Sequence, residues 1–302
     1  MIQRVLVGAT ASGKKAVAAA LHERHGVRLL SMDSIKVYRG MDIGSDKPDA
    51  ALRRRAPFAL LDLVGHDQAF SAGDWVRAAR VELGREGAPA LFAGGTPLYL
   101  RLLLRGLCPA PPSDPELRKA LALVWEREGE AVVRRELAHG DPDLAARLLP
   151  GDAKRLLRGL EVLRTTGRPL SVWQAQHTRP VVEGRVVVAA LRRPPEVQLA
   201  RAAQRIQDML ARGLVAEVEA LRARAAFARE PARAIGYAEA LAVLDGVLAA
   251  AALPERMLVR TRQLLRKQRQ HLAGFPELVW VDVGSHDSAE SVADRVARVL
   301  EL

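Results

Sequence analysis

The sequence predicts an α/β fold in which a P-loop-containing parallel sheet core is flanked by helices and interrupted by an inserted all-helical subdomain. Three observations lead to this prediction. Short apolar runs alternate with helix-compatible stretches up to about residue 110, the middle of the chain is helix-patterned throughout, and apolar β-branched runs return after it. We expect the catalytic core at residues 1–112 and 184–302 and the insertion at 113–183.

The first expected strand is the apolar run at residues 5–7, which leads into a glycine-rich segment and then a helix-compatible stretch. A strand, a glycine-rich turn and a helix form the context of a P-loop, whose backbone N–H groups and lysine bind phosphate. The alternative is a turn that merely connects strand to helix. We expect diphosphate to contact Gly8, Thr10, Ala11, Ser12, Gly13, Lys14 and Lys15.

One position departs from the P-loop pattern G-x-x-x-x-G-K-[ST]. Lys15 stands where a Ser or Thr hydroxyl normally helps to hold Mg²⁺. A phosphorylated ligand is therefore expected, while an ammonium at this position would repel a metal ion rather than bind it.

The second expected strand, residues 27–31, ends close to Asp33. Because C-terminal strand ends converge on the ligand crevice of an open parallel sheet, we expect Asp33 near the P-loop. Its carboxylate could act as a general base or a Mg²⁺ ligand, or could simply cap a helix together with Ser34. Residues 37–48 are rich in glycine and polar side chains and predict an extended functional loop.

The rest of the N-terminal half continues the alternation. We expect a strand at 58–63, a helix at 71–85 that begins near Ser71 or Asp74, and a strand at 89–93. The last strand runs into two glycines and Thr96, where a bare backbone permits close approach to a ligand and the hydroxyl offers a donor.

The expected insertion follows a proline-rich turn at residues 109–113 and is helix-patterned from residue 114 to about 178. Its leucine and aromatic stripes are interpreted as core. Lys154 and Arg158 share a helical face at i and i+4, for which a solvated surface is the alternative to ligand binding.

After the insertion, residues 186–191 predict a central strand and residues 199–212 a helix with Arg201, Arg205 and Arg212 on one face. Aligned cations repel one another unless an anion lies opposite them. We therefore favour phosphate near the first two arginines, although Asp208 could neutralise one. A second basic stripe contains Arg262, Arg266 and Arg269 with Lys267, and residues 279–302 predict one strand and one helix.

Composition restricts the functional classes. The chain has 46 Lys and Arg against 35 Asp and Glu, a formal charge of +11, which favours a polyanionic partner, although an arginine-rich proteome could explain part of the excess. A single cysteine, Cys108, excludes an internal disulfide and a cysteine-based zinc cluster. With strand-like sequence from Ile2 and no apolar run of membrane-spanning length, we expect a soluble, cytoplasmic protein without a membrane partner, and a monomer.

Three motifs carry a family resemblance. In order and spacing, G-A-T-A-S-G-K, M-D-S-x-x-V-Y-R-G-M-D-I-G-S-D-K-P and A-G-G-T-x-L-Y are similar to the tRNA dimethylallyltransferase (IPP transferase) family, and the resemblance covers nearly the whole chain. It implies an enzyme that transfers a dimethylallyl group from dimethylallyl diphosphate to N6 of adenosine 37. The implied substrates are tRNAs that read codons beginning with U, and the implied products are i6A37 and diphosphate.

The resemblance also implies site residues. Asp33, Thr96 and Arg201 would be catalytic, and the insertion would grip the anticodon stem-loop. The implied tRNA contacts are Asp33, Ser34, Ile35, Lys36, Thr96, Arg118, Lys154, Arg155, Leu156, Leu157, Arg158, Arg205, Arg233, Gly236, Tyr237, Lys267 and Arg269. Two positions depart from the family pattern: Lys154 replaces a Gln, and His271 with Leu272 stands near a usual Trp, which removes a stacking surface.

Prenyl transfer requires a neutralised leaving diphosphate, a positioned nucleophile and a proton acceptor. Asp33 is our choice of acceptor, for an adenine extruded from the anticodon loop. Mg²⁺ is the expected cofactor. Either Asp33 and diphosphate oxygens alone hold the metal ion, or Lys15 replaces part of its charge. Activity is then expected to depend less steeply on Mg²⁺ than is usual.

Two other functional classes share these motifs. A P-loop nucleotide kinase or NTPase, with ATP as its ligand, would use the same loop. However, the sequence has no acidic residue at an expected strand end other than Asp33, and a kinase would not explain the arginine-rich second half of the chain. A tRNA-binding homologue that has lost catalysis is conceivable because of Lys15, but the retention of Asp33, Lys14 and Thr96 argues against it.

Overall fold

The computed structural model describes residues 2–176, 180–182 and 184–302, which fall into two compact units. The first unit is formed by residues 1–104 and 181–302 and the second by 105–180. The second unit begins earlier than the expected residue 113, because Cys108 and Ala110 pack against its core. The other expected boundary falls at residue 183, which lies outside the described residues.

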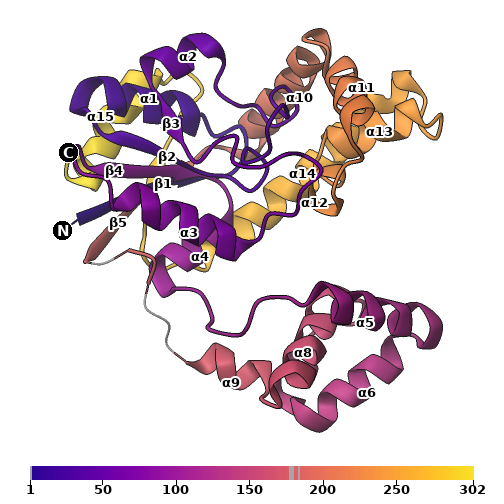
Figure 1. Cartoon of the computed structure of the whole chain (residues 1–302). Coiled ribbons are helices and arrows are strands. Elements are labelled where there is room, and N and C mark those ends of the chain that lie inside the picture. The colour runs from indigo at the N-terminus through magenta and orange to yellow at the C-terminus, as the bar shows by residue number, and fades with distance from the viewer. Residues whose placement is uncertain (1, 177–179, 183) are drawn as a thin grey trace. The chain divides into compact units, whose positions relative to one another are not determined.

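The described part of the first unit contains a six-stranded, all-parallel sheet with the strand order β3-β2-β4-β1-β5-β6 (Figure 1). Its strands are β1 (Ile2–Gly8), β2 (Arg28–Met32), β3 (Phe58–Ala59), β4 (Ala90–Gly94), β5 (Arg185–Arg192) and β6 (Leu278–Asp282). The innermost strand β1 pairs with β4 and β5, so that Val5 lies opposite Phe92 and Val188. Strands covered on both faces become continuous apolar runs, as these three are. The expected α/β class is confirmed.

Helices cover both faces of this sheet (Figure 1). The helices of the first unit are α1 (Lys14–His25), α2 (Ala50–Arg55), α3 (Ala72–Leu83), α4 (Pro97–Arg105), α10 (Pro195–Ala211), α11 (Leu214–Arg224), α12 (Arg229–Ala232), α13 (Tyr237–Leu244), η1 (Ala250–Ala252), α14 (Leu253–Ala273) and α15 (Ala289–Leu300). Side chains of α1 and α15 form the core on one face, and those of α3 and α4 form the core on the other. A third core joins α10, α11, α13 and α14 to Val37, Tyr38 and Met41. The long loop is thereby packed onto the helices that follow β5.

The second unit is helical throughout its described residues. Its helices are α5 (Pro115–Glu128), α6 (Glu130–Gly140), α7 (Pro142–Arg147), α8 (Ala153–Thr166) and α9 (Leu170–Ala175). Aspartates cap three of them, with Asp114, Asp141 and Asp152 accepting backbone N–H groups of α5, α7 and α8. The predicted helix-rich stretch is confirmed up to residue 176. Its last expected residues, 177 and 178, lie outside the described part of the chain.

Two expected elements differ from those observed. The strand expected at 58–63 ends at Ala59, because Leu60 and Asp62 adopt positive φ angles of 63° and 57° that turn the chain away. The helix expected from residue 199 begins at Pro195, since proline is well tolerated in the first turn. The helix expected near Ser71 is confirmed, and Ser71 and Asp74 form a capping box at its start.

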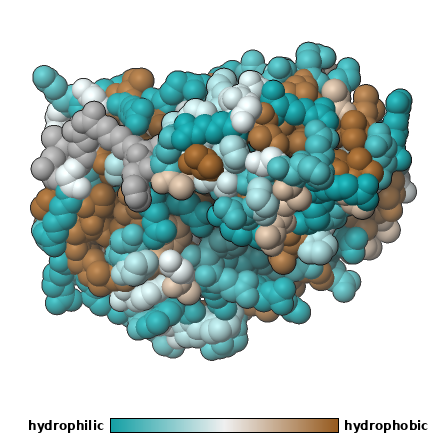
Figure 2. All heavy atoms as spheres, turned by 90° about the horizontal axis from the view of Figure 1, so that it is seen from below, coloured by the Kyte–Doolittle hydropathy of each residue, from teal (hydrophilic) through white to brown (hydrophobic). Residues whose placement is uncertain are grey.

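The visible surface mixes hydrophilic and hydrophobic residues (Figure 2). Figure 2 shows hydrophilic residues over much of one face, with hydrophobic residues in smaller areas between them. Among the described residues, no helix combines the length and the apolar character needed to cross a bilayer.

Candidate active site

Residues 8–15, the predicted P-loop (below called the P-loop), link the end of β1 to the start of α1. Gly13 has a φ angle of 93°, a conformation that side-chain-bearing residues rarely adopt, and Ala11 has one of 59°. Since Gly13 has no side chain, the first N–H groups of α1 are not capped by it and remain directed at the loop. The Ser12 hydroxyl is buried without a hydrogen-bond partner among the described residues. A buried donor without a partner fits a loop that is completed by an anion.

Three neighbouring strands end at this loop. Gly94 ends β4, and a Cβ there would lie 2.0 Å from the carbonyl oxygen of Met32. A Cβ at Gly95 would lie 2.9 Å from the carbonyl oxygen of Gly8 and 3.3 Å from Lys14 Nζ. The two glycines therefore let the ends of β1, β2 and β4 meet, as the sequence predicted from the convergence of strand ends.

Asp33 lies at this junction, directly after β2. Its Oδ1 accepts the backbone N–H groups of Ile35 at 2.9 Å and of Lys36 at 3.3 Å. Its Oδ2 accepts no hydrogen bond from the described residues. Next to it, the N–H of Ser34 donates to Thr96 Oγ1 at 3.2 Å. One carboxylate oxygen thus orders the turn, and the other is available to a substrate proton.

Arginines of α10 approach the loop from a second direction. Arg201 Nε lies 3.3 Å from the carbonyl oxygen of Ala11, and Arg205 Nη2 lies 2.6 Å from Thr10 Oγ1. Arg212 lies beyond the end of α10 and is exposed. Asp208 instead accepts Gln204 Nε2 at 3.0 Å. The two arginines that we expected near phosphate therefore contact the loop at Thr10 and Ala11, and their binding of phosphate stays a prediction.

The site carries more positive than negative charge. The pKa of Lys14 is lowered to about 8, chiefly by burial. Among the neighbouring charges, Lys36 lowers this pKa more than Asp33 raises it. Burial likewise lowers the pKa of Lys36, against the opposing effect of Asp33. Arg205 Nε is buried without a partner among the described residues. Partly buried cations without enough counter-charge are suited to an anionic ligand.

The residues present do not fit the usual P-loop metal site. Lys15 Nζ binds Asp46 Oδ1 at 2.7 Å, so an ammonium occupies the position of the metal-binding hydroxyl. No group of three or more His, Cys, Asp or Glu side chains among the described residues could hold a metal ion. Mg²⁺ as a cofactor stays a prediction, with Asp33 and substrate oxygens as candidate ligands.

Three residues that hold the loop were not singled out from the sequence. Gln268 of α14 accepts the N–H of Thr10 at 2.9 Å and donates to the carbonyl oxygen of Gly95 at 2.7 Å. Gln198 of α10 donates to the carbonyl oxygen of Thr10 at 2.6 Å, and Arg193 Nε to that of Ser12 at 3.0 Å. Arg193 could have been predicted, because it directly follows a strand, β5, as Asp33 directly follows β2. No comparable sequence signal marks the two glutamines.

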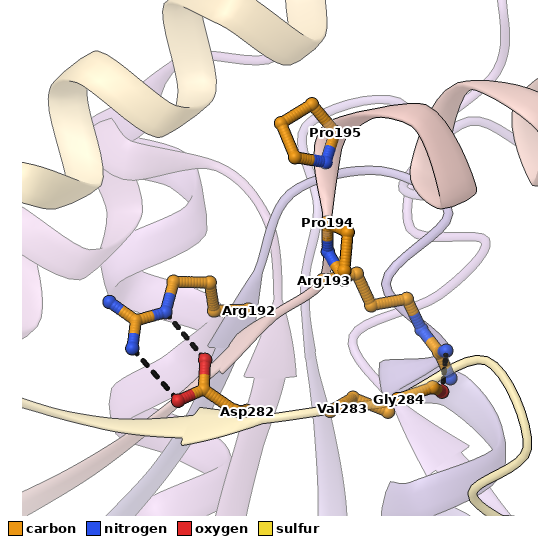
Figure 3. Close-up of a pocket in the computed structure, with 7 residues that line it drawn as sticks. All are labelled: Arg192, Arg193, Pro194, Pro195, Asp282, Val283 and Gly284. Atoms are coloured by element: carbon orange, nitrogen blue, oxygen red, sulfur yellow. Dashed lines mark hydrogen bonds and ion pairs between the residues drawn. The ribbon is translucent and has the colours of Figure 1, made fainter.

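Arg193 also borders a hollow of about 390 Å³ at the ends of β5 and β6 (Figure 3). In this view Arg193 reaches Gly284, whose carbonyl oxygen it binds at 2.6 Å, while Arg192 forms a two-fold ion pair with Asp282. Arg192 is neutralised by Asp282, and Arg193 is held by the carbonyl oxygens of Ser12 and Gly284. We therefore interpret the hollow as a support for the loop at Ser12 rather than as a second anion site. A larger hollow of about 500 Å³ lies between α10 and α14 and is lined by Arg262, Arg266 and Arg269.

In the helical unit, the predicted tRNA contacts surround a buried carboxylate. Arg118 and Arg158 bind Glu161 Oε2 at 2.8 and 2.9 Å, and Glu161 is 1% exposed. Lys154 and Arg155 are exposed on the same helix. Leu156 and Leu157, in contrast, are buried in the core of the unit. Their expected contact with tRNA stays a prediction, and their observed role is packing.

The remaining predicted contacts lie on the α12–α14 region. Arg233 and Lys267 are exposed, and Arg269 binds Gln198 Oε1. Gly236 forms a turn with a φ angle of 92°, and Tyr237 is fully buried. For these two, a direct contact with tRNA stays a prediction, while the structure shows a packing role.

Comparison with known proteins places this site in a family. The family model described as IPP transferase matches residues 36–274, and that described as isopentenyl transferase matches residues 1–55. The chain belongs to the IPP transferase family. It is accordingly an enzyme of the prenyltransferase class, as the sequence motifs predicted.

The bacterial relatives named below match over nearly their full length. The tRNA dimethylallyltransferase of Xylella fastidiosa is 39% identical over 310 residues, covering 98% of this chain and 95% of the relative. That of an Azoarcus species is 40% identical over 306 residues, covering 98% and 96%. Among solved structures, the tRNA isopentenylpyrophosphate transferase of Bacillus halodurans is 26% identical with a TM-score of 0.68, covering 99% of this chain and 97% of that one. A eukaryotic dimethylallyltransferase acting on tRNA shares the fold, with a TM-score of 0.82 at 23% identity, covering 98% and 77%.

Proposed function

We propose that this protein transfers a dimethylallyl group from dimethylallyl diphosphate to N6 of adenosine 37 in tRNAs that read codons beginning with U. The products are i6A37 and diphosphate. Family membership and relatives named tRNA dimethylallyltransferase support the reaction. The observation that carries it is that the predicted P-loop and the Asp33 carboxylate lie together at one edge of the sheet.

The P-loop side of the site would bind and neutralise the diphosphate. The N–H groups at the start of α1, with Lys14, Arg201 and Arg205, provide donors in a partly buried setting. Negative charge grows on the diphosphate as the allylic C–O bond breaks. Donors that are already oriented stabilise this charge most strongly, because they need not reorganise during the reaction.

The other side of the site would position the nucleophile. Asp33 Oδ1 is tied to backbone N–H groups, so Oδ2 is held in a fixed direction as the acceptor of the N6 proton. Thr96 is fixed by its bond to Ser34 and lies beside it as a hydroxyl donor. Adenine must leave its stack in the anticodon loop to reach this carboxylate, and backbone contacts offset that cost.

Two basic surfaces are the candidates for those backbone contacts. One is the exposed cationic face of the helical unit, where Lys154 and Arg155 lie on the same helix as Arg158. Arg158 and Arg118 both bind Glu161. The other is the arginine-lined hollow between α10 and α14. Arginine forks match phosphate oxygens, and the formal charge of +11 favours binding of a polyanion.

The deciding experiment is a single-turnover assay with labelled dimethylallyl diphosphate and an anticodon stem-loop. Asp33→Asn keeps the shape of the side chain but removes the proton acceptor. We expect its transfer rate to fall by about 10²- to 10⁴-fold, which is the usual contribution of a general base. Asp67→Asn, an exposed aspartate outside the site, is the matched control and should react at the parental rate.

The same assay tests the substrate assignment. A stem-loop with guanosine at position 37 should not be prenylated, and one whose anticodon reads codons beginning with another base should react poorly. If Asp33→Asn transferred the group as fast as its parent, the proposed role of the carboxylate would be wrong. Transfer to the guanosine-37 stem-loop would contradict the proposed acceptor.

A further inference from the structure

Lys15 is the residue of the P-loop whose chemistry differs most from the usual motif. Its Nζ lies 2.7 Å from Asp46 Oδ1 and 3.4 Å from the Asp46 carbonyl oxygen. A serine or threonine hydroxyl is bound to Cβ and is too short to span the same distance. The ammonium is therefore held in place by a partner that a hydroxyl at position 15 would not reach.

Asp46 is a built partner rather than a chance neighbour. It comes from the loop at residues 37–48 with a φ angle of 53°, and its N–H donates to the carbonyl oxygen of Ile43 at 3.0 Å. Its Oδ2 also faces Arg205 Nη1 at 3.5 Å. Burial alone would raise the pKa of Asp46, but Lys15 and Arg205 outweigh it and hold the pKa below its usual range. The carboxylate thus stays ionised and fixes two cations beside the loop.

The charges around the loop do not balance among themselves. Four cations, Lys14, Lys15, Lys36 and Arg205, act on one another and on two carboxylates, Asp33 and Asp46. When all four are protonated, cations outnumber carboxylates by two within this group. In the usual P-loop, neutralisation of the phosphate is shared between the lysine and a hydroxyl-bound Mg²⁺. Here the additional charge is covalently part of the chain.

We propose that Lys15, held by Asp46, takes the place of the P-loop metal ion, so that the protein captures a prenyl diphosphate without Mg²⁺. The inference rests on the proposed function for the identity of the ligand. It concerns binding of the diphosphate and assigns no step of the transfer to the metal. Its consequence is that affinity for the diphosphate is insensitive to chelation of divalent ions.

The test measures binding rather than turnover. Isothermal titration calorimetry with a non-transferable thiolo analogue of dimethylallyl diphosphate is carried out in EDTA and in millimolar Mg²⁺. We expect the parent to bind with affinities that agree within about threefold under the two conditions. Lys15→Thr, which restores the hydroxyl, should lose about tenfold in EDTA and regain affinity with Mg²⁺, since it exchanges one charge-assisted contact for a metal ligand.

Two further variants separate charge from shape. Lys15→Met keeps the length of the side chain without charge or hydroxyl, and should bind weakly with or without Mg²⁺. Arg24→Thr removes one positive charge at the far end of α1 and should behave as the parent. Circular dichroism and thermal unfolding of each variant confirm that it is folded. Bound Mn²⁺, followed by electron paramagnetic resonance, should accompany the analogue in Lys15→Thr but not in the parent.

The outcomes distinguish this inference from the function on which it rests. If Mg²⁺ strengthened binding to the parent more than tenfold, and Lys15→Thr behaved in the same way, Lys15 would not replace the metal although the diphosphate site would stand. If the parent bound neither the analogue nor inorganic diphosphate in either buffer, the proposed function itself would be wrong. Tight binding by Lys15→Met in EDTA would also overturn the inference.

Discussion

At the scale of single residues, Lys14 has a charge that depends on what occupies the site. Its pKa is lowered from 10.5 to about 8, first by burial and then by the neighbouring Lys36. A bound diphosphate supplies the missing counter-charge and favours the protonated ammonium. Above pH 8, Lys14 of the free protein therefore loses a proton that it retains in the complex. Binding of the diphosphate in this pH range is accompanied by uptake of a proton by Lys14.

This linkage gives a pH-dependent prediction. Between pH 8 and 10.5 we expect Lys14 to lower the affinity for the thiolo analogue by at most tenfold per pH unit, because this residue takes up to one proton on binding. Below pH 8 Lys14 is already protonated in the free protein, so its uptake disappears. Calorimetry at about pH 9 in two buffers of different ionisation enthalpy measures the protons directly. Equal heats in the two buffers would contradict the assigned role of Lys14.

At the scale of elements, one carboxylate of α11 organises the loop that carries Asp46. Glu217 accepts the N–H groups of Asp42 at 3.0 Å, Ile43 at 2.7 Å and Gly44 at 3.3 Å. It also accepts the Tyr237 hydroxyl at 2.6 Å. Burial first, and then the Glu217 charge, raise the pKa of Tyr237, so its hydroxyl stays protonated and remains a donor. One side chain thus joins the loop to α11 and α13.

We therefore predict that Glu217→Ala destabilises the protein. The substitution leaves several backbone donors and a buried tyrosine hydroxyl without an acceptor, at a cost of about 2–3 kcal/mol in the free energy of unfolding. Urea unfolding followed by circular dichroism measures the loss. Glu219→Ala, an exposed neighbour on the same helix, is the control and should change stability by less than about 0.5 kcal/mol. Equal stabilities of the two variants would show that the loop is held by other contacts.

The same elements show what sequence patterns can and cannot predict. Asp33 and Thr96 were predictable because both follow apolar strands, and parallel strand ends converge. Arg201 and Arg205 were predictable from helical spacing. The partner of Lys15 was not, because the residue that pairs with it lies 31 positions away in an irregular loop. Glu217 orders that loop by accepting its backbone N–H groups. This contact depends on how α11 packs against the loop, and no local sequence pattern reveals it.

Gln268 is a second case of this kind. It lies in a stretch of α14 where arginines and glutamines alternate, and nothing local distinguishes it from Gln263 or Gln270. Only the packing of α14 beside the P-loop brings its amide between Thr10 and Gly95. The strand expected at 58–63 was too long for a related reason, since its end is set by positive φ angles that apolar periodicity does not reveal.

At the scale of the whole molecule, basic residues lie at both edges of the sheet, and only one edge carries the candidate active site. Arg262 and Arg266 line the hollow between α10 and α14, on the same side of the sheet as the P-loop, since Gln268 of α14 reaches the loop. Arg24 lies in the last turn of α1 and Arg185 begins β5, so both lie at the opposite edge of the sheet. A polyanion bound over the active site would meet the first pair and not the second.

This arrangement predicts the salt dependence of tRNA binding. Each phosphate contact that is lost removes counterion release, so the double variant Arg262→Ala, Arg266→Ala should reduce the slope of log K against log salt by about 1.5 to 2. The loss of affinity should be similar for all tRNAs, because phosphate contacts carry no sequence information. Fluorescence anisotropy with a labelled tRNA over a series of salt concentrations measures the slope. The double variant Arg24→Ala, Arg185→Ala is the control, because it removes the same charge at the opposite edge of the sheet, and its slope should equal that of the parent. If both double variants reduced the slope equally, the net charge of the protein, rather than the surface of Arg262 and Arg266, would govern tRNA binding.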